Sequence, residues 1–77
     1  MILITGANGM VGRALIQLLL ADYAYIKALV YPDEPLCLPH SPRLVITGGD
    51  INSVDWTPLL EEVETIVHLA ASVHVFD

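Results

Sequence analysis

The sequence predicts an α/β fold built on a parallel sheet, for three reasons. Four short runs of apolar residues are expected to form strands. The connections between them are helical or long, and strands joined in this way pair in parallel through right-handed crossovers. A glycine-rich turn at residues 6–12 leads from the first run into a segment of helical periodicity. The chain has 77 residues, so it holds one domain at most.

The first expected strand and the first expected helix lie on either side of this turn. Residues 1–4 are wholly apolar, which is typical of a strand buried on both faces of a parallel sheet. The helix is expected to begin near Met10 and to end at Asp22. Its apolar face is expected to contain Val11, Leu15, Leu18 and Leu19.

Three further strands are expected at residues 25–31, 44–47 and 65–70. Residues 32–43 contain four prolines, which remove amide donors and disfavour helix at the preceding residues. This connection is therefore expected to be a loop that replaces the second helix of a regular βαβαβ unit.

A short helix is expected before the last strand. Thr57 can act as its N-cap with Pro58 at the first helical position, although a start nearer Ser53 is the alternative. Glu61 and Glu62 would then lie near the positive end of the helix.

Composition limits the classes of function. The chain is 55% hydrophobic, and three basic residues stand against nine acidic ones, for a net charge of −6. Neither a nucleic acid nor a membrane is expected as a partner, because phosphate binding needs more basic residues and the apolar stretch 14–21 is too short to span a bilayer. No targeting segment is visible, and the single cysteine permits no internal disulfide. We therefore expect a cytoplasmic protein.

Gly6, Gly9 and Gly12 have a spacing that suits a phosphate-binding turn. The first turn of a helix has unpaired amide donors and a positive dipole, so it attracts anions. Gly6 permits a sharp turn, Gly9 removes a side chain where phosphate would approach, and Gly12 lets helix and strand pack closely. The spacing is not G-x-G-x-x-G, and the lysine of a P-loop is missing. From these residues alone, a plain strand-to-helix turn stays the alternative.

Three motifs together resemble the extended short-chain dehydrogenase/reductases, which include the NAD-dependent epimerase/dehydratase proteins. Residues 5–12, TGANGMVG, are similar to the fingerprint T-G-x-x-G-x-x-G. Residues 49–51, GDI, are similar to the element G-D-[IL] after the third strand, and residues 68–71, HLAA, to H-x-A-A at the end of the fourth. The resemblance covers nearly the whole chain, from Met1 to about Phe76.

The resemblance implies a partial Rossmann-type doubly wound sheet with four parallel strands in the order 3-2-1-4. Residues 1–77 would be the N-terminal part of an NAD(P)-binding domain, without the catalytic and substrate-binding half. The cofactor would be NAD or NADP. A small-molecule substrate would bind through the missing half, and a homo-oligomer is left open.

The resemblance also implies roles for residues at the carboxyl ends of the strands. The pyrophosphate and adenosine ribose would be lined by Gly6, Asn8, Gly9, Met10, Val11 and Gly12. Asp50 and Ile51 would bracket the adenine, with the Asp50 carboxylate accepting a hydrogen bond from its exocyclic amine. Leu69, Ala70 and Ala71 would run past the cofactor ribose beside the nicotinamide.

Tyr31 ends the second expected strand, where the choice between NAD and NADP is usually made. Asp33 follows two residues later, and an acid in this region can accept a hydrogen bond from the ribose 2′-hydroxyl. No cation lies close in sequence, so NAD is slightly favoured. NADP stays open because Arg13 or Arg43 could fold into range.

Several polar residues have simpler explanations. Asp50, taken alone, is a turn residue at the end of a strand, and His68 in its apolar strand is expected in the core rather than as a catalyst. Cys37 and His40 have the spacing of half a zinc site, but no second pair exists, so no metal is expected.

No catalytic residue is expected in this chain. The family uses a Ser/Thr, Tyr and Lys set, the last two written Y-x-x-x-K on a helix. Tyr23 and Lys27 match that pattern, but their segment leads into a strand, where four steps span about 13 Å rather than the roughly 5–6 Å of a helical turn. The family's motif would follow beyond residue 77.

Three functions are compatible with the sequence. The first is dinucleotide binding as the N-terminal fragment of an epimerase, dehydratase or reductase that acts on a nucleotide sugar or a carbonyl or alcohol substrate. The second is a non-catalytic NAD(P)-sensing module, and the third is a small interaction protein that binds no nucleotide.

Overall fold

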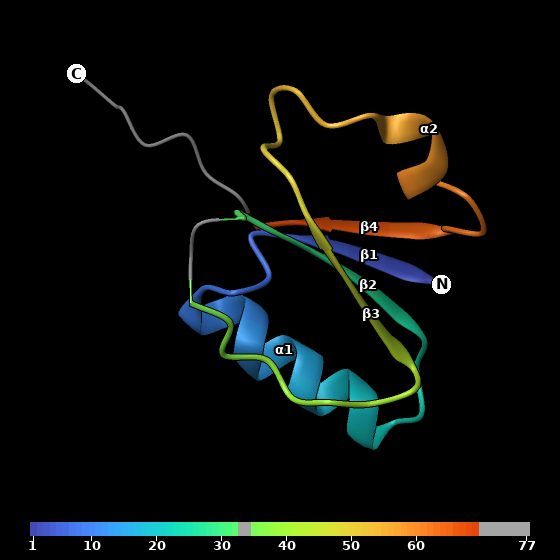
Figure 1. Ribbon diagram of the computed structural model, residues 1–77. Helices are drawn as coiled ribbons and strands as arrows, with labels where there is room; N and C mark the ends of the chain where they lie inside the picture. Colours follow the sequence, from blue (N-terminus) through green and yellow to red (C-terminus); the bar gives the residue numbers. More distant parts are fainter. Residues whose placement is uncertain (33–34, 70–77) are drawn as a thin grey trace.

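The computed structural model describes residues 1–32 and 35–69, which form a four-stranded parallel sheet with helices on its two faces (Figure 1). The strands are β1 (Ile2–Thr5), β2 (Ile26–Val30), β3 (Leu44–Gly48) and β4 (Thr65–His68). Their order is β3-β2-β1-β4, which confirms the expected Rossmann-like arrangement. Residue 70, included in the expected fourth strand, lies outside the described residues.

The strands share one register, so their carboxyl ends meet at one edge of the sheet. Thr5 at the end of β1 pairs with Leu29 on one side and with His68 on the other. Leu29 in turn pairs with Thr47 near the end of β3. The turns that leave these strands are therefore neighbours in space, although they are far apart in the sequence.

Helix α1 (Met10–Ala21) covers one face of the sheet and ends, as expected, with Asp22 as its C-cap. Leu15 and Leu19 pack against the core as expected. The rest of the expected face is wrong, because Val11 is 64% and Leu18 70% exposed, whereas Gly12 and Ile16 are buried. The reason is that Gly12 packs against the backbone of Ala7 in the glycine turn, and Ile16 packs in the core one turn later. The buried stripe therefore runs through Gly12 and Ile16, and positions 11 and 18 turn outward.

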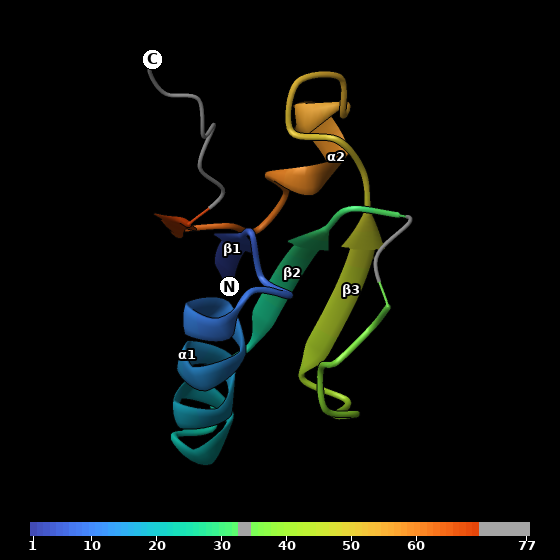
Figure 2. The same ribbon diagram turned by 90° about the vertical axis from the view of Figure 1, so that its left-hand side faces the viewer.

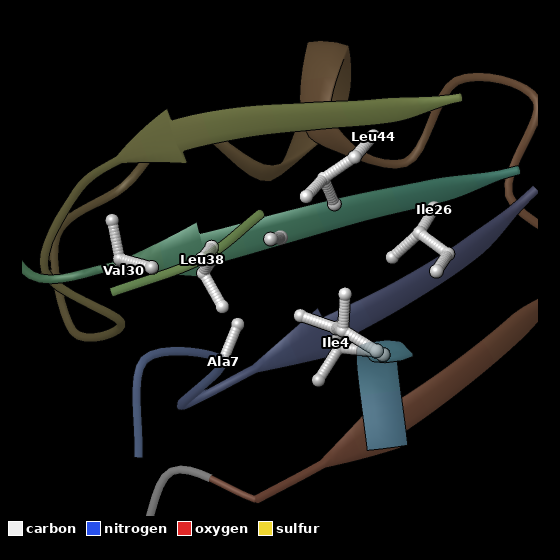
Figure 3. Packing of buried hydrophobic residues seen from close by; sticks show 8 residues of the cluster. Ile4, Ala7, Ile26, Val30, Leu38 and Leu44 are labelled. Carbon is white, nitrogen blue, oxygen red and sulfur yellow. The ribbon is translucent and has the colours of Figure 1, made fainter. Parts of the chain in front are cut away.

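The loop at residues 35–43 runs beside α1 on the same face of the sheet (Figure 2). It holds no helix in its described residues, as expected from the prolines. Leu38 is only 8% exposed and joins the core cluster that contains Ile4, Ile16 and Ile26. Figure 3 shows Leu38 beside Val30 and Ala7 of this cluster. One buried leucine thus covers sheet surface that a second helix would otherwise cover.

Helix α2 (Trp56–Leu59) lies on the opposite face, where Leu59 packs with Leu3 and Leu29. The expected N-cap was wrong: Asp55 is the N-cap, and its Oδ1 accepts a hydrogen bond from the Thr57 amide at 3.1 Å. Pro58 then falls at the third helical position, where the missing N–H costs nothing because that amide has no partner within the helix.

The C-terminal end of α2 lies at Leu59 and also differs from the expectation. Glu61 and Glu62 come after its last residue, not near its positive end as expected. Lys27 of β2 stabilises this end instead, because its Nζ donates to the carbonyl oxygens of Pro58, Leu59 and Glu61 at 3.3, 3.2 and 2.8 Å.

The approach of α1 to β1 leads to the first prediction. A Cβ added at Gly12 would lie 2.6 Å from the Ala7 carbonyl oxygen, a backbone atom that cannot move aside cheaply. We expect Gly12→Ala to lower the free energy of unfolding by about 1–3 kcal/mol or more. Urea unfolding of the full-length protein measures this. Gly9→Ala is the matched control, because its Cβ would meet its nearest atom at an ordinary 3.4 Å; equal loss in both variants would contradict the packing argument.

Candidate functional site

The carboxyl edge of the sheet brings most of the expected site residues together. Three backbone hydrogen bonds join the turns that follow the strands: Ala7 N to Leu29 O at 3.3 Å, Gly49 N to Val30 O at 2.9 Å, and Leu69 N to Thr5 O at 3.2 Å. The glycine turn therefore lies beside the end of β2, and residues 49–51 lie beside Tyr31. Ala70 and Ala71 lie outside the described residues.

The glycine turn has the geometry that its sequence predicts. Gly6 has a φ of 64°, a conformation that residues with a side chain rarely adopt. Its carbonyl oxygen accepts a hydrogen bond from the Gly9 amide at 3.2 Å, which closes a tight turn. Gly9 is then the N-cap of α1, and the close contact of Gly12 with Ala7 sets where the helix begins relative to β1.

The N-terminus of α1 offers amide donors to an anion. The first hydrogen bond at this end runs from Arg13 N to Gly9 O at 2.9 Å, so the amides of Met10, Val11 and Gly12 precede it. Gly9 has no side chain to cap them, and the first turn holds no acidic residue. Gly9, Met10 and Val11 are exposed. Amide donors and the positive end of the helix dipole therefore coincide at an exposed end of the helix, an arrangement that attracts anions.

Asn8 is half-buried within the turn, and both ends of its carboxamide contact the loop that follows β2. Its Nδ2 donates to Pro35 O at 2.6 Å, and its Oδ1 accepts from Cys37 N at 3.0 Å. These contacts were not visible in the sequence, because they join residues 27 and 29 positions apart.

Asp50 and Ile51 lie in the turn after β3, next to the end of β2. One carboxylate oxygen of Asp50 accepts a hydrogen bond from Asn52 N at 2.9 Å, which is the turn role expected for an aspartate at the end of a strand. The side chain is exposed, and its Oδ2 has no partner among the described residues. The carboxylate can therefore hold its own turn and still accept a hydrogen bond from a ligand.

Thr5 joins the end of β1 to the end of β4. Its Oγ1 lies 2.9 Å from His68 Nδ1 and accepts a hydrogen bond from Leu69 N at 3.1 Å. No role was expected for Thr5, although it is the first residue of the fingerprint and is only 1% exposed. Through this side chain, the turn after β4 is held at the same edge as the glycine turn.

His68 was expected in the core, and this expectation was wrong because the side chain is exposed. In β4, Ile66 pairs with Leu3 and His68 with Thr5, so both lie on the face that carries α2. Ile66 is also 54% exposed, so the short α2 does not cover this part of β4. Nδ1 of His68 nevertheless has a partner in Thr5.

The two arginines lie at different ends of the sheet. Arg43 comes just before β3 at the amino edge of the sheet, where its guanidinium lies 4.9 Å from the centre of the Tyr23 ring. The expectation that Arg43 could reach the cofactor ribose is therefore wrong. Arg13, in the first turns of α1, has a buried Nε without a partner in the part of the chain that the structure describes.

Tyr23 and Lys27 do not form a catalytic pair. Lys27 lies in β2, as expected, and its Nζ donates hydrogen bonds to carbonyl oxygens at the end of α2. Tyr23 follows α1 with a φ of 61° and stacks on Arg43. The two side chains thus contact different elements.

A cavity of about 400 Å³ lies on the α2 face, away from the glycine turn. It is lined by Lys27, Val45, Thr47, Val54, Asp55, Pro58 and Leu59. None of these is an expected site residue, and the amine of Lys27 is already bound to three carbonyl oxygens.

Among residues 1–32 and 35–69, no group of three His, Cys, Asp or Glu side chains could hold a metal ion, and no helix could cross a membrane.

The fold and the uncapped helix after a glycine turn define a Rossmann-type nucleotide-binding sheet. Comparison with known proteins identifies the family, because the model of the NAD dependent epimerase/dehydratase family matches residues 2–77. The chain belongs to this family. The family is described as NAD dependent, which confirms the expected type of cofactor, a nicotinamide dinucleotide. No curated protein matches the chain.

Solved structures agree with this assignment. The chain is similar to MoeE5 in complex with UDP-glucuronic acid and NAD, with a TM-score of 0.79 and 32% identity over 96% of this chain. It also has the fold of a "putative epimerase from Burkholderia cenocepacia J2315", with a TM-score of 0.67 and 24% identity over 94% of this chain. The chain spans only 23% and 25% of these two proteins.

The contact between Thr5 and the end of β4 leads to a second prediction. Thr5→Val keeps the size of the side chain but leaves the Leu69 amide without the Oγ1 acceptor. The Leu69 amide keeps its hydrogen bond to the Thr5 carbonyl oxygen. We therefore expect a loss of about 0.5–1.5 kcal/mol in the free energy of unfolding, the net contribution of a hydrogen bond. Thr47→Val, on β3, is the matched control, because no side-chain hydrogen bond of Thr47 is found in the described residues. Urea unfolding of both variants decides, and equal stability would contradict the role of Thr5.

Proposed function

We propose that this chain binds NAD and is the cofactor-binding part of an enzyme that acts on a nucleotide sugar. The observation that carries the proposal is the N-terminus of α1. It has no side-chain cap and no acidic residue in its first turn, and it follows a turn that a left-handed glycine makes possible. Such an end is suited to the diphosphate that joins the two halves of a dinucleotide.

Eight of the twelve expected site residues then have a defined contribution. The amides of Met10, Val11 and Gly12 would bind the diphosphate, while Gly9 leaves room for it. Oδ2 of Asp50 would accept a hydrogen bond from the adenine amine, while Oδ1 holds the turn. Leu69, with Ala70 and Ala71 beyond the described residues, would pass the nicotinamide ribose.

NAD is preferred over NADP because of where the cations lie. The 2′-phosphate of NADP needs a basic partner near the end of β2. Arg43 stacks on Tyr23 at the amino edge, and Lys27 is bound to the carbonyl oxygens of α2. Arg13, in the first turns of α1, is the remaining arginine, and its Nε is buried.

The substrate class is taken from the similarity to MoeE5, which was solved with UDP-glucuronic acid and NAD. When bound, NAD would accept a hydride from a carbon of the substrate and could return it. The acid and base residues of such a reaction are expected outside these 77 residues, because the described part holds no Tyr–Lys pair suited to them. No observation favours a non-catalytic dinucleotide sensor.

Substitution at Gly9 tests the proposed binding mode. In Gly9→Leu, the new side chain would occupy the space in front of the first-turn amides. Loss of two charge-assisted hydrogen bonds predicts NAD binding weakened by about 100-fold or more, equivalent to roughly 2.7 kcal/mol. Isothermal titration calorimetry on the full-length protein measures this.

Ala21→Leu is the control, since it adds the same side chain to an exposed position at the other end of α1. Circular dichroism should be the same for the parent and both variants. Unchanged NAD affinity in folded Gly9→Leu, or no NAD binding by the parent protein, would refute the proposed function.

A further inference from the structure

The turn after β3 is held by backbone hydrogen bonds at both of its ends. At its start, Gly49 N donates to Val30 O of β2 at 2.9 Å. Further along, Asp50 O accepts hydrogen bonds from Ser53 N at 3.0 Å and from Val54 N at 2.8 Å. The chain therefore folds back on itself between residues 49 and 54, and Val54 returns to the start of the turn.

The side chain of Val54 packs directly against the glycine at this start. A Cβ added at Gly49 would lie 3.0 Å from Val54 Cγ2 and 3.4 Å from Val54 Cβ, so the valine leaves little room for a side chain at position 49. Val54 also packs against the buried cluster of Leu3, Leu29 and Leu59. It thus connects the turn after β3 to the core beneath α2.

The contact between Val54 and Gly49 encloses Asp50. Gly49 directly precedes Asp50, and Val54 N is bound to the Asp50 carbonyl oxygen. The Asp50 carboxylate is exposed, and its Oδ1 accepts from Asn52 N within the same turn. A hydrogen bond from Oδ2 to a ligand needs a donor at about 2.7–3.2 Å, so its strength depends on where the backbone of this turn lies.

We propose that Val54 is a positioning residue for adenine recognition, because its packing on Gly49 holds the Asp50 carboxylate where it accepts a hydrogen bond from the exocyclic amine. This inference rests on the proposed function. Val54 offers the cofactor no polar side-chain group, so it acts through Asp50. Val54 also lines the cavity beside α2, so truncating its side chain would enlarge an existing space and leave the turn without this support.

The quantity that reports on this role is the preference for NAD over nicotinamide hypoxanthine dinucleotide. In the second compound a carbonyl oxygen replaces the exocyclic amine, so it cannot donate there to the Asp50 carboxylate. A hydrogen bond to a charged group predicts that the full-length parent protein binds NAD about 10-fold or more tightly than the hypoxanthine compound. Isothermal titration calorimetry gives this ratio, which a general loss of stability would not change.

A size exchange between the two residues in contact tests the role of the valine. Val54→Ala opens the contact and Gly49→Ala crowds it, so we expect each to lower the preference for NAD by about 3-fold or more. Gly49 does not have a positive φ, so an alanine there meets a limit of space and not of backbone conformation. In the double variant Gly49→Ala/Val54→Ala, the added methyl group fits the space that the valine leaves. We expect this variant to regain most of the parent preference.

Val63→Ala is the matched control. It makes the same truncation in a side chain that packs against the same buried cluster, but Val63 follows α2 and does not belong to the turn. We expect it to lower the free energy of unfolding, measured in urea, and to leave the preference for NAD unchanged.

The outcomes separate this inference from the proposed function. A lower preference in both single variants, regained in the double variant and unchanged in Val63→Ala, supports the positioning role. An unchanged preference in either single variant, no recovery in the double variant, or an equal loss in Val63→Ala overturns it while NAD binding stands. A parent protein that binds both dinucleotides equally also overturns it, because Asp50 then does not recognise the amine. If the parent binds neither, the proposed function fails, and this inference fails with it.

Discussion

The contact between Gly12 and the backbone at Ala7 is the constraint on which the rest of the structure depends. A Cβ at position 12 would lie 2.6 Å from the Ala7 carbonyl oxygen, so the helix can approach β1 this closely only with glycine there. The close approach brings the first turn of α1 to the carboxyl edge of the sheet. Without it, the amides of residues 10–12 would not start this close to the turn in which Ala7 donates to the end of β2.

Side chains, together with three backbone hydrogen bonds between the turns, hold the remaining parts of this edge in place. Thr5 connects β1 to the turn after β4, and Asn8 connects the glycine turn to the proline-rich loop. On the α2 face, Lys27 donates hydrogen bonds to the C-terminal end of the helix that follows the turn at residues 49–51. A small sheet with one long helix and one short one thus positions several turns through a few polar contacts and the buried side chains Leu38 and Leu59.

Much of the fold could be predicted from local patterns. The apolar runs and the glycine turn specified the strands, their parallel pairing and the start of α1, because burial and backbone freedom act locally at these positions. The N-cap of α2 was misjudged because Asp55 and Thr57 are both good caps. The choice between them depends on which helix start lets Leu59 pack on Leu3 and Leu29.

Contacts between segments that are distant in the sequence could not be predicted from local sequence patterns. His68 was assigned to the core because its neighbours in β4 are apolar, but its exposure depends on how far α2 extends over that strand. Arg43 was expected to be able to reach the cofactor ribose. Its stacking on Tyr23 instead places it at the opposite edge of the sheet. The partners of Asn8 likewise depend on the path of a loop that has no periodic pattern.

The central claim, that the first turn of α1 binds the diphosphate of NAD, is tested most directly by nuclear magnetic resonance. Backbone amide signals of the isotopically labelled full-length protein would be followed during titration with NAD. We predict that the amides of Met10, Val11 and Gly12 shift most strongly, because they would donate hydrogen bonds to the phosphate oxygens. NAD-induced shifts confined to other regions, such as the cavity under α2, with these three amides unmoved, would contradict the account.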